Sequence, residues 1–350
     1  MSLQELGISH KKIKKKKVAY FNFQGEIKDI HPKIEQFYEK CKDFVFGPAI
    51  AIIDYGVYSE GGKDIHLCFQ LKNQKKNNLQ IKFLESIEVL SITHQGSFDT
   101  LNKTFQIISS YLQDHLVSGT SLLRLIYHKY NKKNPEKNQI ELQFPLHKWD
   151  DRLEKNLDKV LGKKIRNEIM KGRDELFTIE SSCEDRIQWL KSMLDRLDKI
   201  ATDDEKYDII SRCAHEFSQK RIDYMRRIYE KNRNIDEVLI EMRKDYTWYE
   251  NPVRKGNIVF VSKIPVNPEE YENAKTLEDK KKHYCHCRFI NSNLDKGISS
   301  TFCNCGTGWY RQIWEGILGK PIRIKILKSL LKGDETCQVA IYLPENKILN

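Results

Sequence analysis

Two stretches of the sequence decide the fold: V-A-Y-F-N-F-Q-G at residues 18–25 and V-L-S-I-T-H-Q-G at residues 89–96. Apolar side chains alternate along each stretch up to a Gln-Gly pair, which predicts a strand that ends in a turn. The residues that follow place apolar side chains three and four positions apart, which predicts a helix with one buried face. These positions are Ile30, Ile34, Phe37, Tyr38 and Cys41 in the first copy, and Leu101, Phe105, Ile108 and Leu112 in the second.

Each helical stretch is followed by two further strand patterns. They lie at residues 49–55 and 65–71 in the first copy and at residues 122–127 and 140–146 in the second. The chain therefore repeats a strand–helix–strand–strand (β-α-β-β) unit. Two such units predict an α+β fold in which an antiparallel sheet is layered by two helices, with a cleft along the pseudo-twofold axis between the copies.

The rest of the chain predicts a second domain. Residues 150–247 are charged and show helical periodicity, and the capping patterns Ser181-x-x-Glu184 and Thr202-x-x-Glu205 predict two helix starts. Residues 248–350 mix strand patterns with a helix pattern at residues 309–318, which predicts a cysteine-rich α+β part. The expected organisation is a basic disordered tail at 1–17, the duplicated domain at 18–149, a helical part at 150–247 and the cysteine-rich part at 248–350.

Length and composition limit the class of protein. A chain of 350 residues with 39% hydrophobic residues has enough apolar material for two domains. The sequence shows no signal-peptide pattern and no apolar run long enough for a membrane span, so we expect a cytoplasmic protein without a membrane partner. Nine cysteines without a secretion signal indicate reduced thiols rather than a disulfide framework.

The net charge of +11 raises the question of nucleic-acid binding. Residues 1–17 alone carry a net charge of +5, because residues 11–17 read K-K-I-K-K-K-K. A terminal lysine run is typical of a solvated, disordered tail. No helix-turn-helix pattern precedes the duplicated domain, so specific nucleic-acid binding is not expected. A nucleic-acid-associated regulator acting through these lysines is kept as an alternative.

Three motifs in the second copy carry a family resemblance: T-H-Q-G-S-F at residues 93–98, L-I-Y at 125–127 and Q-I-E-L-Q-F-P-L at 139–146. With them, residues 18–149 resemble the gyrase-inhibitor-like effector-binding domain of AraC-type and MerR-type regulators. The resemblance implies a ligand sensor in which a carboxylate on the last strand projects into the cleft and meets a cationic or polar ligand. The matching carboxylate in this chain is Glu141.

The ligand-binding residues predicted on this basis are Glu141, its first-copy counterpart His66, and the corresponding tyrosines Tyr55 and Tyr127. A buried carboxylate beside aromatic faces attracts cations, so the expected ligand is a small organic molecule that is cationic or amphipathic. Two alternatives stay open: Glu141 pairs with a lysine on an exposed strand face, and the tyrosines are core residues. The expected function is a small-molecule sensor without its own DNA-binding helix-turn-helix, and a homodimer is one expected form.

The second domain contains a cluster of metal-binding residue types. H-Y-C-H-C at residues 283–287 and C-N-C at residues 303–305 supply two Cys-x-Cys pairs. Four thiolates from two chain segments suit tetrahedral zinc, so Cys285, Cys287, Cys303 and Cys305 are the predicted ligands, with Cys337 and His283 in reserve. The alternatives are buried or reactive thiols and a disulfide.

A second resemblance covers residues 257–343. Cys305 before an aromatic helix, E-G-I-L-G at residues 315–319, a strand pattern at 322–326 and G-D-E-T-C at 333–337 resemble the 4-vinyl-reductase-type sensor domain and the aminothiazoline carboxylate hydrolase family. Those relatives often carry a cysteine near the position of Ser329. The sequence also leaves enzyme alternatives open: a hydrolase using Glu141 with Tyr127, or Cys303 or Cys305 as a nucleophile beside His283 or His286.

Overall fold

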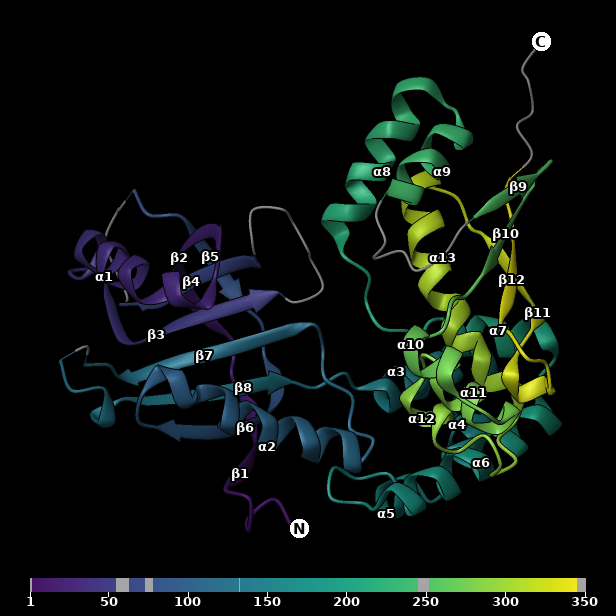
Figure 1. Ribbon diagram of the computed structural model, residues 1–350, viewed down its shortest axis with the longest axis horizontal. Helices are drawn as coiled ribbons and strands as arrows, with labels where there is room; N and C mark the ends of the chain where they lie inside the picture. Colours follow the sequence, from purple (N-terminus) through teal and green to yellow (C-terminus); the bar gives the residue numbers. More distant parts are fainter. Residues whose placement is uncertain (1, 55–62, 73–77, 132, 245–251, 345–350) are drawn as a thin grey trace. The chain divides into compact units, whose positions relative to one another are not determined.

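A computed structural model describes residues 2–54, 63–72, 78–131, 133–244 and 252–344. The chain divides into two compact units, Met1–His147 and Lys148–Asn350, and Figure 1 labels the elements of each. The two units are taken one at a time below. No described helix has both the length and the apolar composition that crossing a membrane requires.

The N-terminal unit is built on an eight-stranded antiparallel sheet in the order β1-β6-β8-β7-β3-β4-β2-β5. The first copy of the repeat consists of β2 (Lys16–Gly25), α1 (Ile30–Cys41), β3 (Val45–Asp54) and β4 (Lys63–Leu71). The second copy consists of β6 (Ile87–Gln95), α2 (Leu101–Asp114), β7 (Leu122–Lys129) and β8 (Gln139–Pro145). The predicted α+β fold and its duplicated β-α-β-β unit are therefore confirmed.

The two copies meet where β3 pairs with β7, in a register that sets Ile50 opposite Ile126. Both helices cover one face of the sheet. Phe37 of α1 contacts Phe69 of β4 at a ring-centroid distance of 5.8 Å, and Phe105 of α2 contacts Phe144 of β8 at 5.3 Å. Because side chains alternate along a strand, the residues next to Phe69 in β4 and next to Phe144 in β8 face the opposite side of the sheet.

Residues 1–17 are not the disordered tail that the lysine run predicted. Residues 8–13 form β1 (Ile8–Ile13), which pairs with β6, and Lys16 and Lys17 already belong to β2. Buried residues anchor this segment, because Leu3 and Ile8 are less than a tenth exposed. Strand pairing at the edge of the sheet overrides the preference of a lysine-rich segment for solvent, and charged side chains are common on edge strands.

The link between β1 and β2 curls the sheet. β1 and β2 lie near opposite ends of the strand order, yet only two residues separate them, so Ile13 and Lys16 are at most about 11 Å apart along the chain. Ile13 of β1 pairs with Ile87 of β6, and Lys16 of β2 pairs with Leu84 of β5 (Ile81–Leu84). The strand pairing therefore continues across the link from β1–β6 to β2–β5. A two-stranded ribbon thus joins both ends of the sheet, and the face opposite the helices becomes concave.

The C-terminal unit begins with seven helices along residues 149–244. They are α3 (Trp149–Leu161), α4 (Lys163–Ile169), α5 (Arg173–Leu176), α6 (Cys183–Ile200), α7 (Asp203–Ser211), α8 (Gln219–Asn232) and α9 (Ile235–Lys244). The capping box of Thr202 and Glu205 starts α7 as predicted. The predicted start of α6 is wrong by one residue, because Ser182 rather than Ser181 accepts the N-cap hydrogen bond, from the Asp185 amide.

A four-stranded antiparallel sheet in the order β11-β12-β10-β9 completes this unit. Its strands are β9 (Val253–Lys255), β10 (Ile258–Ser262), β11 (Arg323–Lys328) and β12 (Gln338–Tyr342). The helices of this part are α10 (Pro268–Asn273), α11 (Leu277–Tyr284), α12 (Arg288–Asn291) and α13 (Asn304–Leu318). Tyr310, Ile313, Trp314 and Ile317 of α13 are at the centre of the core, where they join side chains of the sheet and of α7 to α9.

Candidate functional site

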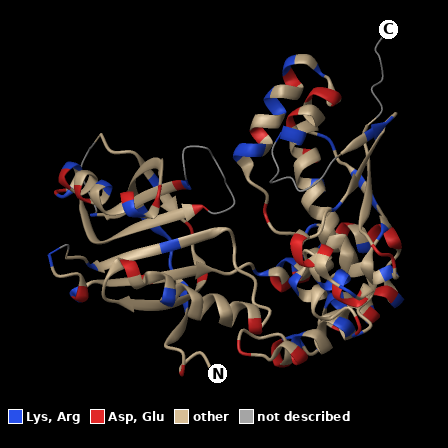
Figure 2. Cartoon of the chain, viewed as in Figure 1, with Lys and Arg blue, Asp and Glu red and all other residues tan. Residues whose placement is uncertain are grey.

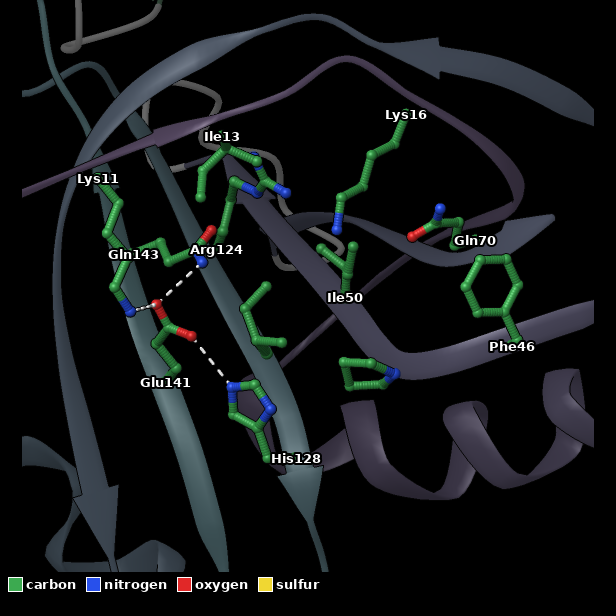
Figure 3. A pocket seen from close by; sticks show the side chains of 12 residues that line it. Lys11, Ile13, Lys16, Phe46, Ile50, Gln70, Arg124, His128, Glu141 and Gln143 are labelled. Atoms are coloured by element: carbon green, nitrogen blue, oxygen red, sulfur yellow. Dashed lines mark hydrogen bonds and ion pairs between the residues drawn. The ribbon is translucent and has the colours of Figure 1, made fainter. Parts of the chain in front are cut away.

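The concave face of the N-terminal sheet encloses a cavity of about 360 Å³. Residues of β3, β4, β7 and β8 and of the ribbon strands β1 and β2 line it, and Figure 3 shows these residues. They are Lys11, Ile13, Lys16, Phe46, Pro48, Ile50, Gln70, Arg124, Ile126, His128, Glu141 and Gln143. The volume lies within the ordinary range for sites that hold small organic molecules.

Glu141 lies at the polar end of the cavity and is 6% exposed. Its Oε1 accepts hydrogen bonds from Lys11 Nζ at 2.9 Å and from Gln143 Nε2 at 3.0 Å, and its Oε2 lies 3.0 Å from His128 Nε2. Burial alone would raise the pKa of this carboxyl. The hydrogen bonds from His128, Lys11 and Gln143 outweigh that effect and lower the pKa to about 2.

Arg124 is the most buried cation of the cavity, with 4% exposure. Its Nε is inaccessible to water and has no hydrogen-bond partner, and among the described residues no hydrogen bond or ion pair reaches its guanidinium. Burial lowers the pKa of Arg124, although Cys68 and Glu141 act in the other direction. Arginine stays protonated even when it is buried. The positive charge of Arg124 is thus not paired by a hydrogen bond or ion pair with any described residue.

The apolar side of the cavity comes from Ile13, Phe46, Pro48, Ile50 and Ile126. Ile50 and Ile126 also belong to a buried cluster with Val18 and Cys68 on this face of the sheet. Phe46 is 47% exposed, so its ring reaches both the cavity and the solvent. One wall of the cavity is thus apolar while the opposite end carries hydrogen-bonding and charged groups.

The structure places the four predicted ligand residues differently. Glu141 lines the cavity. His66 is in β4 and is not among the lining residues, and its Nδ1 lies 2.9 Å from Lys82 Nζ. Tyr127 faces the helices, where its ring stacks on Phe98 at 6.3 Å and its buried hydroxyl finds no hydrogen-bond partner among the residues that the structure describes. Tyr55 lies outside the described residues.

The polar groups that contact Glu141 were missed by the sequence argument. Gln143 and His128 stand two residues from Glu141 and Ile126, so period-two alternation puts them on the same face. The same alternation places Arg124 on the cavity face of β7 and Tyr127 on the opposite face. No comparable signal marked Lys11, because its contact with Glu141 depends on the pairing of β1 with β6.

Comparisons with solved structures give a similarity of fold over 40% of this chain. The C-terminal domain of EcmrR matches with 20% identity, a TM-score of 0.34 and 96% of its own chain covered. SAV2435, solved with tetraphenylphosphonium bound, matches with 11% identity, a TM-score of 0.30 and 93% of its chain covered. A hydrolase from Listeria innocua matches with 12% identity, a TM-score of 0.31 and 91% of its chain covered. No protein-family model and no curated protein matches the chain.

The predicted zinc ligands lie at helix ends of the C-terminal unit. Cys285 follows α11, Cys287 precedes α12, Cys303 precedes α13 and Cys305 is in its first turn. Among the described residues, no group of three or more His, Cys, Asp or Glu side chains is arranged to hold a metal ion. Zinc binding by these four cysteines, with Cys337 and His283 in reserve, stays a prediction that metal analysis of the purified protein would test.

The four cysteines are half-buried. Burial, reinforced by neighbouring thiols, raises the pKa of Cys287 and of Cys305 to about 12 and also raises that of Cys285. Burial also raises the pKa of Cys303 to about 11, and its Sγ lies 3.1 Å from Ser329 Oγ. His286 Nε2 lies 2.8 Å from the carbonyl oxygen of Ile264. All nine cysteines are described, and all are free, so the disulfide alternative is wrong.

Proposed function

We propose that the N-terminal unit binds a small organic molecule in the concave cavity. The observation that carries this proposal is the cavity of about 360 Å³ with an apolar wall and a polar end. Such a combination suits a ligand with an apolar body, which the wall removes from water, and a polar group, which the opposite end orients. The resemblance to effector-binding domains supports the same function.

Catalysis by Glu141 is a weaker candidate. A general base works best when its pKa is near the working pH, whereas the pKa of Glu141 is lowered to about 2. Tyr127, the assisting residue of that alternative, faces away from the cavity. The raised pKa values of Cys303 and Cys305 likewise keep these thiols protonated near neutral pH, which disfavours the nucleophile alternative.

The lysine run supports ligand binding more than nucleic-acid binding. Lys11 donates to Glu141 inside the cavity, and Lys15 pairs with Glu85 at 2.8 Å. These contacts hold the two lysines within the sheet unit, so they do not act as a free basic arm. In the view of Figure 2, acidic and basic segments also alternate along the helices of the C-terminal unit. A small-molecule sensor remains our proposal, and the homodimer stays a prediction.

The test uses the neutral fluorescent probe N-phenyl-1-naphthylamine, which brightens in apolar surroundings. We expect it to bind, and we expect Phe46→Ala to weaken binding by about tenfold, because the lost ring removes apolar contact worth ~1–2 kcal/mol. Phe83→Ala is the matched control, since Phe83 is equally exposed (55%) in the same unit and does not line the cavity. Equal affinities of both variants would place the probe elsewhere and contradict the proposal.

A further inference from the structure

We propose that the cavity takes an amphipathic organic anion, such as a carboxylate, sulfonate or phosphate ester with an apolar body. Its negative group would lie against Arg124 and Lys16, and its body against Phe46, Pro48 and Ile50. This inference rests on the proposed function and adds the chemical class of the ligand. It also differs from the cationic ligand that the family resemblance implies.

The charge of the lining is the first argument. The ionic residues around the cavity are Lys11, Lys16, Arg124 and Glu141. Lys11 and Glu141 form an ion pair at 2.9 Å and neutralise each other. Lys16 and Arg124 remain, and no ion pair or hydrogen bond joins either of them to another described side chain. The cavity therefore presents two positive charges, those of Lys16 and Arg124, that no described side chain pairs by direct contact.

The burial of Arg124 is the second argument. A charged group that is 4% exposed loses most of its contact with water, and no described residue offers an acceptor to its Nε in exchange. Such a group is costly unless an opposite charge meets it. The planar guanidinium matches the two oxygens of a carboxylate, sulfonate or phosphate, which would supply the missing acceptors.

The position of the two cations is the third argument. Arg124 comes from β7 and Lys16 from the start of β2, so separate elements bring them to one cavity. Figure 3 shows both side chains extending into the space between the ribbon and β3. The apolar wall formed by Phe46, Pro48 and Ile50 borders the same space. A ligand with a charged head and an apolar body can therefore engage both features at once.

The state of Glu141 argues against a cationic ligand. Lys11, Gln143 and His128 already occupy both carboxylate oxygens. An organic cation would have to displace the Lys11 ammonium and would then lie beside Arg124, whose charge repels it. Lys11 thus takes the place at Glu141 that a cation would need.

The experiment compares two probes with the same apolar body. 1-Anilinonaphthalene-8-sulfonate carries a sulfonate, and N-phenyl-1-naphthylamine lacks it. We expect the full-length protein to bind the sulfonate at least about tenfold more tightly, because a hydrogen bond to a charged group is made only by that probe. Added salt should weaken binding of the sulfonate and leave binding of the neutral probe unchanged.

Single substitutions test which residues cause the tighter binding of the sulfonate probe. Arg124→Met keeps an unbranched apolar stem without the guanidinium charge, and it should lower affinity for the sulfonate by about tenfold or more. Lys16→Met should lower it by a smaller factor, and it serves as the test if Arg124→Met does not fold. Lys15→Met is the matched control, because Lys15 carries the same charge one residue away and pairs with Glu85 outside the cavity. Neither cavity variant should weaken the neutral probe.

The outcomes separate the two proposals. Equal affinity for both probes, or loss of the sulfonate preference in Lys15→Met instead of Lys16→Met, would overturn the anion assignment while leaving the binding function intact. Tighter binding of tetraphenylphosphonium than of the sulfonate, with competition at the same site, would overturn it in favour of a cation. Failure of both naphthalene probes to bind would count against the binding function itself.

Discussion

Glu141 shows how one residue depends on distant parts of the chain. Its charge is stabilised by His128 and Gln143 from the same sheet face and by Lys11, which is 130 residues away. The lowered pKa of the carboxyl means that the ionised form contributes to the stability of the fold. That contribution has a definite dependence on pH.

We predict that Glu141→Gln removes this dependence. The folded-state pKa of about 2 lies below the ordinary value of 4.5, so the stabilisation is present above pH 4.5 and is lost as the pH falls toward 2. The difference between the two values corresponds to about 3 kcal/mol. In urea unfolding followed by far-UV circular dichroism, the variant should be less stable than the parent at pH 7, and the gap should narrow below pH 4.5 and close only below about pH 2.

Glu136→Gln is the control for this measurement, because Glu136 is an exposed carboxylate of the same unit. Its stability should follow that of the parent protein at each pH. A gap between Glu141→Gln and the parent that stays constant from pH 7 to pH 3 would show that the carboxylate is not held ionised by its neighbours.

At the residue scale, the sequence identified the carboxylate but not its surroundings. The motif Q-I-E-L-Q pointed to Glu141, and Glu141 lines the cavity. The partner Lys11 was hidden because pairing between β1 and β6 is a long-range event that local patterns do not encode. Tyr127 was grouped with Glu141 by the repeat alignment, although strand alternation separates the two faces.

At the element scale, α13 packs closely against α7 at Gly308. A Cβ atom added at Gly308 would lie 1.8 Å from the carbonyl oxygen of Ser211 and 2.7 Å from the Cβ of Ala214. The first turns of α13 therefore touch the end of α7 and the residues after it, and only glycine permits this approach. The helix cannot accept a methyl group there without moving its backbone.

We predict that Gly308→Ala destabilises the C-terminal unit by ~2–3 kcal/mol or more, because overpacking against backbone atoms forces the helix to shift. Gly306→Ala is the matched control in the same helix, since nothing lies within 4 Å of its added Cβ. This control should be neutral or stabilising by up to ~1 kcal/mol through helix propensity. Thermal unfolding followed by tryptophan emission measures both, and equal effects would contradict the close contact.

Element boundaries were predicted best where a local pattern is strong. The Thr202 capping box and both copies of the repeat agree with the structure, because short-range side-chain contacts and period-two alternation fix them. The lysine run at residues 11–17 was misread, because composition favoured a tail while the neighbouring Ile8 and Ile13 fit an edge strand. The Cys-x-Cys pairs lie at helix ends, which their spacing did not predict.

At the scale of the whole molecule, the two units carry separate cores. All five tryptophans of the chain follow His147 in the sequence, so tryptophan emission reports on the C-terminal unit alone. We predict that Glu141→Gln shifts the unfolding transition seen by far-UV circular dichroism but not the one seen by tryptophan emission. Gly308→Ala should shift the tryptophan transition and leave the sheet unit unchanged. Parallel shifts in both signals for either variant would show that the units unfold as one.

The sequence predicted the N-terminal unit more completely than the C-terminal one for a physical reason. Because the β-α-β-β unit is duplicated, its pattern of strands and helix occurs twice in the sequence, and the assignment of each copy can be checked against the other. The C-terminal unit has no such repeat, and its core joins α7 to α9 with α13 and the sheet across long stretches of sequence. Its resemblance to 4-vinyl-reductase-type domains stays a prediction.

The pairing of β1 with β6 also sets the order in which the protein can fold. Closing a loop of 78 residues between Lys11 and Val89 costs about 4 kcal/mol of chain entropy before any contact offsets it. At about 5–20 residues per second, a ribosome needs roughly ten seconds to make the residues between them. During that interval β1 has no β6 to join, and its unpaired edge is open to other chains. The segment that completes the cavity is therefore also open to misassembly during synthesis.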